Sequence, residues 1–256
     1  MKLTFLGTGT STGVPQIGCG CSVCTSSDPR DNRLRSSALL TTDDGSNILI
    51  DCGPDFRTQI LRAGSPEIDC ALITHEHYDH VGGMDDLRPY TYPDGFDIYC
   101  RADVAEDLRR RIPYCFAQSP YPGVPQLHLH EITPGNPFRI KATETGILPV
   151  EIMHWNLPIL GFRIGNLAYI TDCKTMPDET VRQIQGIDTL VLNALRIEPH
   201  NSHLSLSEAI ELIMRIKPRI AYLTHLSHQM GLHAEVERSL PYNVRIAYDG
   251  LCVEIN

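Results

Sequence analysis

Three observations predict an α/β fold for this chain, in one domain over residues 1–256. Short apolar segments of strand length alternate with segments that have the periodicity of helices. Several of the apolar segments end in histidine or aspartate, which is expected where strand ends bring polar side chains to one edge of a sheet. Hydrophobic residues make up 42% of the chain, enough for a full core at this length.

The individual elements follow from this alternation. The predicted strands cover residues 2–6, 37–42, 47–51, 69–74, 96–100, 146–153, 160–164, 166–171, 187–192 and 219–223. The predicted helices cover residues 56–63, 102–112 and 205–217. Ser205 and Glu208 have the spacing of a capping box, so the last helix should begin after Ser205. Residues 113–125, rich in proline and aromatic side chains, are interpreted as a lid or packing loop, and His128 and His130 as one face of a strand.

Composition excludes several classes of function. The net charge of −9 argues against a surface that grips nucleic acid, so nucleic acid is not an expected partner. No apolar run approaches the ~20 residues of a membrane span, and the apolar part of the first residues is too short for a signal peptide. Six of the nine cysteines are scattered and are interpreted as buried free thiols of a protein in the reducing cytoplasm: Cys52, Cys70, Cys100, Cys115, Cys173 and Cys252.

The densest group of polar side chains lies between His75 and His80, directly after an apolar run. Alternate side chains of an extended chain point to the same side, so His75, His77 and Asp79 are expected to converge. His80 should join them where the chain turns. This density of imidazole and carboxylate predicts two metal ions. We expect His75 and His77 on one ion. We expect Asp79 and His80 on the other.

Three further strand ends carry candidate ligands. His154, Asp172 and His225 each stand at the end of an apolar segment, and in an α/β architecture such ends collect along one edge. Each residue alone would be weak support, but together they complete two coordination spheres. Asp51 ends another predicted strand, where it either orients a metal-bound histidine or forms a turn.

A cysteine-rich loop at about residues 18–25 predicts a second kind of metal site. Cys19, Cys21 and Cys24 can direct three thiolates at one zinc ion, which then needs a fourth ligand from elsewhere. Neighbouring cysteines of this kind are poorly spaced for a disulfide, so the alternative is three free thiols. Because the loop has little apolar content, a structural zinc would supply order that packing cannot.

The order H-x-H-x-D-H, then a histidine, an aspartate and a histidine at strand ends, resembles the metallo-β-lactamase superfamily over essentially the whole chain. That resemblance implies an αβ/βα sandwich of two mixed sheets flanked by helices. It also implies seven metal ligands: His75, His77 and His154 on the first ion, Asp79, His80 and His225 on the second, and Asp172 bridging both. A bridging aspartate, rather than a cysteine, resembles the phosphodiesterases of the superfamily more than the true β-lactamases.

A narrower resemblance is to the PhnP-type phosphoribosyl cyclic phosphodiesterases. It is carried by Gly7-Thr8-Gly9, the cysteine loop and residues 223–229. It implies that His228 is the fourth zinc ligand and that His203 is a catalytic histidine, with His200 as the rival candidate. It further implies manganese at the catalytic pair, zinc at the thiolate site and a homodimer. The donor atoms of the catalytic pair alone admit manganese or zinc.

This resemblance implies hydrolysis of a small cyclic phosphodiester, either phosphoribosyl 1,2-cyclic phosphate or a related cyclic nucleotide. A hydroxide bridging the two ions would attack phosphorus, with Asp79 in the metal site and His203 as the acid that protonates the leaving oxygen. Two divalent ions, two aspartates and one hydroxide leave a charge of about +1, which attracts an anionic phosphodiester. A neutral amide or lactam carbonyl gains nothing from that charge.

Three other functions fit parts of the sequence. An RNA 3′-end processing nuclease of the RNase Z type shares the di-metal core, but the chain has no basic, glycine-rich arm for tRNA. A thioester or lactam hydrolase is disfavoured because no cysteine stands at a catalytic ligand position. A metal-binding protein without catalytic activity is disfavoured by a histidine at position 203.

Overall fold

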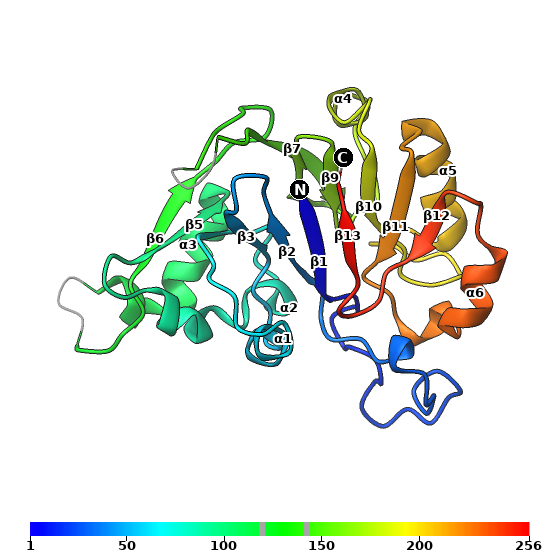
Figure 1. Ribbon diagram of the computed structural model, residues 1–256, viewed down its shortest axis with the longest axis horizontal. Helices are drawn as coiled ribbons and strands as arrows, with labels where there is room; N and C mark the ends of the chain where they lie inside the picture. Colours follow the sequence, from blue (N-terminus) through cyan, green and yellow to red (C-terminus); the bar gives the residue numbers. More distant parts are fainter. Residues whose placement is uncertain (118–120, 141–143, 256) are drawn as a thin grey trace.

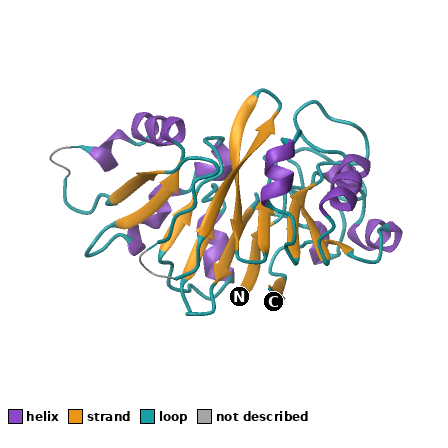
Figure 2. Cartoon of the chain, turned by 90° about the horizontal axis from the view of Figure 1, so that it is seen from above, coloured by secondary structure: helices purple, strands orange, loops and turns teal. Residues whose placement is uncertain are grey.

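Two mixed β-sheets pack face to face in the computed structural model, which describes residues 1–117, 121–140 and 144–255 (Figure 1). Helices lie outside the sheets (Figure 2). The arrangement confirms the predicted αβ/βα sandwich. In the described part of the chain, no helix has the length and apolar character needed to cross a membrane.

The first sheet has seven strands in the order β13 (Cys252–Glu254), β1 (Lys2–Gly7), β2 (Ser37–Thr41), β3 (Asn47–Ile50), β4 (Cys70–Leu72), β5 (Phe96–Cys100) and β6 (Leu127–Glu131). The second has six in the order β12 (Val244–Ile246), β11 (Ile220–Thr224), β10 (Thr189–Asn193), β9 (Leu167–Ile170), β8 (Leu157–Ile164) and β7 (Ile147–His154). In each sheet, one part is antiparallel and the other parallel: β3 to β6 and β9 to β12 are the parallel parts.

The α-helices are α1 (Phe56–Arg62), α2 (Tyr78–Val81), α3 (Ala102–Arg111), α4 (Asp178–Gln183), α5 (Leu206–Ile216) and α6 (His233–Ser239). The described residues also form four short 3-10 helices: η1 (Pro29–Asp31), η2 (Met84–Tyr90), η3 (Pro113–Phe116) and η4 (His228–Met230). The predicted capping box at the start of α5 is confirmed, since Ser205 and Glu208 each accept a hydrogen bond from the other's backbone N–H.

The alternation of side chains along the strands divides the core into layers. In β3, Ile48 and Ile50 lie in the core between the sheets, whereas Leu49 packs in the layer beneath the first group of helices. Val191 of β10 enters the same inter-sheet core from the opposite side. All four side chains are fully buried. The two sheets are therefore held rigidly, and the loops at their ends have a fixed frame.

One local prediction is wrong. The strand expected through residue 74 ends at Leu72, and Asp79 lies in the short helix α2 rather than on an alternating extended segment. His77 is the last extended residue, and its carbonyl accepts from the N–H groups of His80 and Val81. That turn closes a helix, so Asp79 and His80 are placed by helical geometry.

Other differences concern elements whose sequence signals are weak. Helices α4 and α6 and strands β12 and β13 were not predicted, because each is short. The proline-rich segment 113–125 begins with η3, and residues 118–120 of it lie outside the described residues. His128 and His130 do share one face of β6, where both approach Asp97 of β5.

Candidate metal centre

The predicted metal ligands come from strand ends of both sheets and meet at one edge of the sandwich. His75 and His77 follow β4, His154 ends β7, Asp172 follows β9 and His225 follows β11. A backbone bond from Leu160 N to Thr74 O joins the two sheets beside this edge. The residues are separated by up to 150 positions in the chain, and the order of strands and the packing of the two sheets bring them together.

Three overlapping groups of donor atoms lie close enough to share a metal ion. Within each group the atoms are all within 4.8 Å of one another, and the groups are His75, His80 and Asp172; Asp79, His80 and His225; and His154, Asp172 and His203. The His77 ring completes the cluster, with its centroid 4.6 Å from that of His75 and 5.2 Å from that of His154. All seven predicted ligands are thus brought together.

Asp172 lies at the middle of the cluster. Its Oδ2 is 3.2 Å from His80 Nε2, and its Oδ1 is 3.1 Å from His225 Nε2. Asp79 Oδ2 faces the same two imidazoles, at 3.3 Å from His80 and 3.6 Å from His225. Donor atoms of Asp172 also lie within 4.8 Å of those of His75 and His154. Asp172 therefore lies between the ligands predicted for the first ion and those predicted for the second, as a carboxylate that bridges two cations would.

The outer nitrogens of three imidazoles are fixed by hydrogen bonds. Nδ1 of His80 donates to Asp51 at 2.7 Å, and Nδ1 of His75 donates to the Thr74 hydroxyl at 2.9 Å. The Thr74 hydroxyl in turn donates to Asp51. His154 Nδ1 donates to the backbone oxygen of Ser202 at 2.9 Å. When neutral, each ring therefore carries its lone pair on Nε2 and directs it into the cluster, which is the tautomer that a metal ligand requires.

The inner nitrogens fit a metal site because they are buried and lack hydrogen-bond partners. Among the described side chains, Nε2 of His75, His80 and His225 belongs to this class. A buried polar atom left unpaired costs stability, so such a convergence calls for an additional group between them. Imidazole and carboxylate donors suit a divalent transition-metal ion.

The pKa shifts in the cluster also favour a bound cation. Burial acts to lower the pKa of His80, but Asp172, Asp51 and Asp79 outweigh it and raise that pKa well above its usual value. Burial would raise the pKa of Asp172, yet His225 and His80 lower it far below its usual value. The carboxylates thus stay ionised and stabilise positive charge inside the cluster, where a divalent cation would be held.

The sequence suggested two roles for Asp51, to orient a histidine of the metal site or to form a turn, and its geometry fits both. It follows β3 with a φ of 60°, a left-handed turn conformation. Its fully buried carboxylate accepts from His80 and from the backbone and hydroxyl of Thr74. Thr74 was missed, because a threonine before H-x-H carries no signal of its own.

His203 lies against the cluster, whereas His200 lies behind it. The His203 ring stacks on that of His225 at 4.9 Å, and its Nδ1 is 3.6 Å from Asp172 Oδ1. His200 is 5.3 Å from His203 and accepts from the backbone N–H of Ser202. Burial, followed by the neighbouring imidazoles, lowers the pKa of His203 to about 3. Its ring is therefore neutral at pH 7 in the protein alone.

The cysteine loop forms a separate cluster. Donor atoms of Cys19, Cys21, Cys24 and His228 all lie within 4.8 Å of one another, with His228 Nδ1 at 3.5 Å from Cys19 Sγ and 3.3 Å from Cys21 Sγ. A backbone N–H bond from Cys24 and the His228 ring lower the pKa of Cys21 to about 6. Burial raises the pKa of Cys24 to about 11. Three thiols and one imidazole at these distances have the donor set of a structural zinc site.

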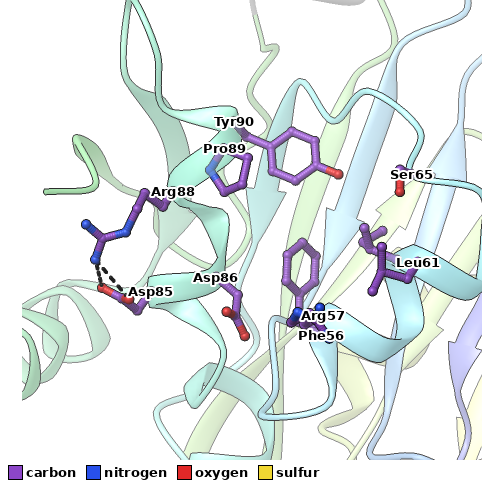
Figure 3. Close-up of a pocket in the computed structure, with 10 residues that line it drawn as sticks. Phe56, Arg57, Leu61, Ser65, Asp85, Asp86, Arg88, Pro89 and Tyr90 are labelled. Carbon is purple, nitrogen blue, oxygen red and sulfur yellow. Dashed lines mark hydrogen bonds and ion pairs between the residues drawn. The ribbon is translucent and has the colours of Figure 1, made fainter. Parts of the chain in front are cut away.

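Two of the hollows in the described part of the chain bear on the choice of a substrate site. One of about 440 Å³ opens directly on the cluster and is lined by His77, His154, Trp155, Asn156, Leu157 and Ser202. The other, of about 390 Å³, lies between α1 and η2 (Figure 3). Phe56 and Tyr90 form its apolar wall, and an ion pair between Arg88 and Asp85 lies at its side. It contains none of the predicted ligands, so the first hollow is the candidate substrate site.

Comparison with known proteins agrees with this geometry. Residues 46–226 match the family described as the beta-lactamase superfamily domain. A crystal structure of a diphosphatase from the PhnP family is 37% identical, covers 98% of this chain and 96% of its own, and superposes with a TM-score of 0.91. Zn²⁺-bound PqqB from Methylobacterium extorquens is 19% identical over the full length of both chains, with a TM-score of 0.81, and so shares the fold.

The chain therefore belongs to the metallo-β-lactamase superfamily and, through the 37% identical structure, to its PhnP family. With its buried histidine and aspartate site, it is a metal-dependent hydrolase of this fold. A curated relative from Porphyromonas gingivalis, named octanoyltransferase, is 44% identical over 252 residues, which are 98% of this chain. The chain spans only about half of that relative, 51% of its length.

Proposed function

We propose that this protein is a di-metal phosphodiesterase that hydrolyses a small cyclic phosphodiester. The observation that supports this most is Asp172, a buried carboxylate that lies within 4.8 Å of His75 and His154 on one side and within 3.2 Å of His80 and His225 on the other. We assign the first ion to His75, His77 and His154, the second to Asp79, His80 and His225, and the bridge to Asp172. When bound, two such ions would polarise the phosphoryl oxygens and activate a water molecule for attack.

The protein's own residues favour an anionic substrate at this place. A di-metal centre with two aspartates keeps a small positive charge of about +1 when it carries hydroxide. A phosphodiester is attracted to that charge, whereas an uncharged carbonyl is not. The relative of 37% identity is called a diphosphatase, which is also an activity on phosphorus.

We assign the general acid to His203. Its stacking on His225 and its approach to Asp172 put it beside the reacting centre, and the more remote His200 lacks these contacts. The pKa of His203 in the protein alone is depressed despite the nearby Asp172, so the ring needs a further negative group before it carries a proton. A bound phosphodiester supplies that charge, so protonation of His203 would be coupled to substrate binding. The proton would then pass from the imidazole to the leaving alkoxide.

The cysteine cluster is proposed to hold a structural zinc, because thiolate donors select zinc among the common divalent ions. For the catalytic pair we propose manganese or zinc. A homodimer and a cytoplasmic location remain predictions. The name octanoyltransferase belongs to a relative about twice the length of this chain, and the matched half need not carry that activity.

The test is turnover of the manganese-loaded protein on phosphoribosyl 1,2-cyclic phosphate and on 2′,3′-cyclic AMP, with precursor tRNA assayed in parallel. Ring opening of a cyclic diester without cleavage of tRNA is the expected result. Cleavage of tRNA alone would show that the protein is an RNA-processing nuclease instead. Inactivity on all three substrates, with both metal sites loaded, would contradict the proposed function.

A further inference from the structure

The hollow beside the metal centre has an unusual residue at its mouth. Trp155, the only tryptophan of the chain, lines it together with His77 and His154. Its side chain is 66% exposed, although tryptophan is among the most buried residue types on average. Exposure of the apolar indole surface to water costs free energy, and a bound ligand that covers the ring would remove that cost.

The backbone at Trp155 is also unfavourable. Trp155 and Asn156 form the two-residue turn between β7 and β8, since His154 pairs with Leu157. Trp155 has a φ of 53°, in the left-handed region that bulky side chains avoid. A non-glycine residue in such a conformation is a reason to look for a function at that site.

The next hairpin of the same sheet provides an internal comparison. The turn between β8 and β9 also has two residues, Gly165 and Asn166, and pairs Ile164 with Leu167. Its first residue has a φ of 55°, nearly that of Trp155, and it is the glycine that this position normally takes. The fold therefore accepts glycine at this turn position, and packing of the hairpin does not require an indole.

The chemistry of the hollow indicates what the indole would cover. Apart from the two imidazoles, its lining is neutral: Trp155, Asn156, Leu157 and Ser202. A second phosphate would find no cationic side chain there among the described residues. A neutral planar group, with edges for the Asn156 amide and the Ser202 hydroxyl, matches these walls. The volume of the hollow, about 440 Å³, lies within the usual range of about 300–1,000 Å³ for small-molecule sites.

We propose that the Trp155 indole is a stacking platform for the base of a nucleotide substrate. This inference rests on the proposed phosphodiesterase function and chooses the nucleotide over the base-free sugar phosphate as the favoured substrate. The base lies over Trp155, and the phosphodiester lies on the metal side of the hollow, next to His77 and His154. Stacking on an aromatic ring tolerates different bases, because every base has a π-face.

The first measurement is the fluorescence of the single tryptophan in the metal-loaded protein. AMP, which carries a base, should quench it in a saturable manner, whereas ribose 5-phosphate should not. The second is catalysis by Trp155→Gly and Trp155→Phe. The glycine variant should lose about 5- to 100-fold in kcat/KM on 2′,3′-cyclic AMP, mostly through KM, and little on phosphoribosyl 1,2-cyclic phosphate. Phenylalanine should restore much of the loss, and Tyr242→Ala, at a 90% exposed site away from the hollow, should change neither substrate.

Stability provides a further check, because glycine relieves the left-handed strain. Trp155→Gly should melt no lower than the parent protein and up to about 2–4 °C higher, so lost activity cannot be ascribed to unfolding. Equal quenching by AMP and ribose 5-phosphate, or equal losses on both substrates, would overturn the platform while leaving the phosphodiesterase intact. Base-dependent quenching without hydrolysis of either diester would support the platform and reject the proposed function.

Discussion

His225 and His228 stand three residues apart, yet each belongs to a different cluster. His225 Nε2 is 3.1 Å from Asp172 Oδ1, whereas His228 Nδ1 is 3.3 Å from Cys21 Sγ. Between them, the N–H and hydroxyl of Ser227 donate to the carbonyl of Leu195. The N–H of Leu195 donates to Leu204, the neighbour of His203. One short segment therefore ties the cysteine cluster to the metal centre and to the loop that carries His203.

The cysteine cluster is expected to bind zinc and to stabilise the fold. Cys21→Ser should remove one zinc ion per chain and lower the free energy of unfolding, by about 2.7 kcal/mol at a free zinc concentration near 100 times Kd. Elemental analysis and thermal melting measure both effects. Cys252→Ser is the matched control, because that thiol is exposed and outside the cluster. An unchanged zinc count in Cys21→Ser would contradict the assignment.

Asp51 is expected to act through the orientation of His80. Asp51→Asn retains a residue that tolerates the left-handed φ of 60° but replaces the carboxylate that accepts from His80 Nδ1. Metal affinity should fall by about 10- to 100-fold. Calorimetric titration of chelator-treated protein with manganese measures this. Asp43→Asn, at an exposed carboxylate that pairs with the N-terminus, should bind as the parent does. Equal affinities in both variants would show that Asp51 is only a turn former.

His203 should matter most where the leaving group is poor. His203→Ala should lose about 10²–10⁴-fold in kcat on a diester that releases an alkoxide, and much less on one that releases nitrophenolate, which needs no proton. His200→Ala, with its side chain behind His203, should show no such dependence. Equal losses of His203→Ala on both substrates would mean that His203 positions the phosphate instead of protonating the leaving oxygen.

His233 should make stability depend on pH. Burial and then Arg33 lower its pKa from 6.5 to about 4, and its Nδ1 lies 3.3 Å from the Arg33 guanidinium, from which a neutral ring can accept. As pH falls, the unfolded chain takes up the proton first. The stabilisation of the folded state by neutral His233 is therefore present above pH 6.5 and is lost as the pH falls from 6.5 to about 4. Its upper bound is about 3 kcal/mol.

Urea unfolding of chelator-treated protein at pH 7.5 and 4.5 measures this loss. His233→Gln should show a smaller difference between the two pH values than the parent protein. The exposed His130→Gln serves as the control and should retain the parent's difference. If His233→Gln lost as much stability as the parent, the buried imidazole would not be the responsible group.

The sequence by itself determined which donor atoms the two clusters contain, because that information is local. H-x-H-x-D-H concentrates donors within six residues, and the spacing of Cys19, Cys21 and Cys24 is that of one tetrahedral ion. The sequence also predicted the capping box at Ser205 correctly, since both of its hydrogen bonds lie within one turn. Periodicity also sufficed for the fold class, with strand ends misplaced by a few residues where extended chain passes into turns.

Only the tertiary structure decided which distant residues meet and what each does there. The packing of the two sheets, together with the order of strands in each, brings the end of β4 near the ends of β7, β9 and β11, and no local pattern encodes that arrangement. Helix α2, rather than strand alternation, places Asp79, because the carbonyl of His77 closes a turn. Asp51 orients His80, and Trp155 projects over the hollow, through contacts and a backbone angle that arise after the sheets have packed. Donor identity is a property of residues, whereas convergence is a property of the packed sheets.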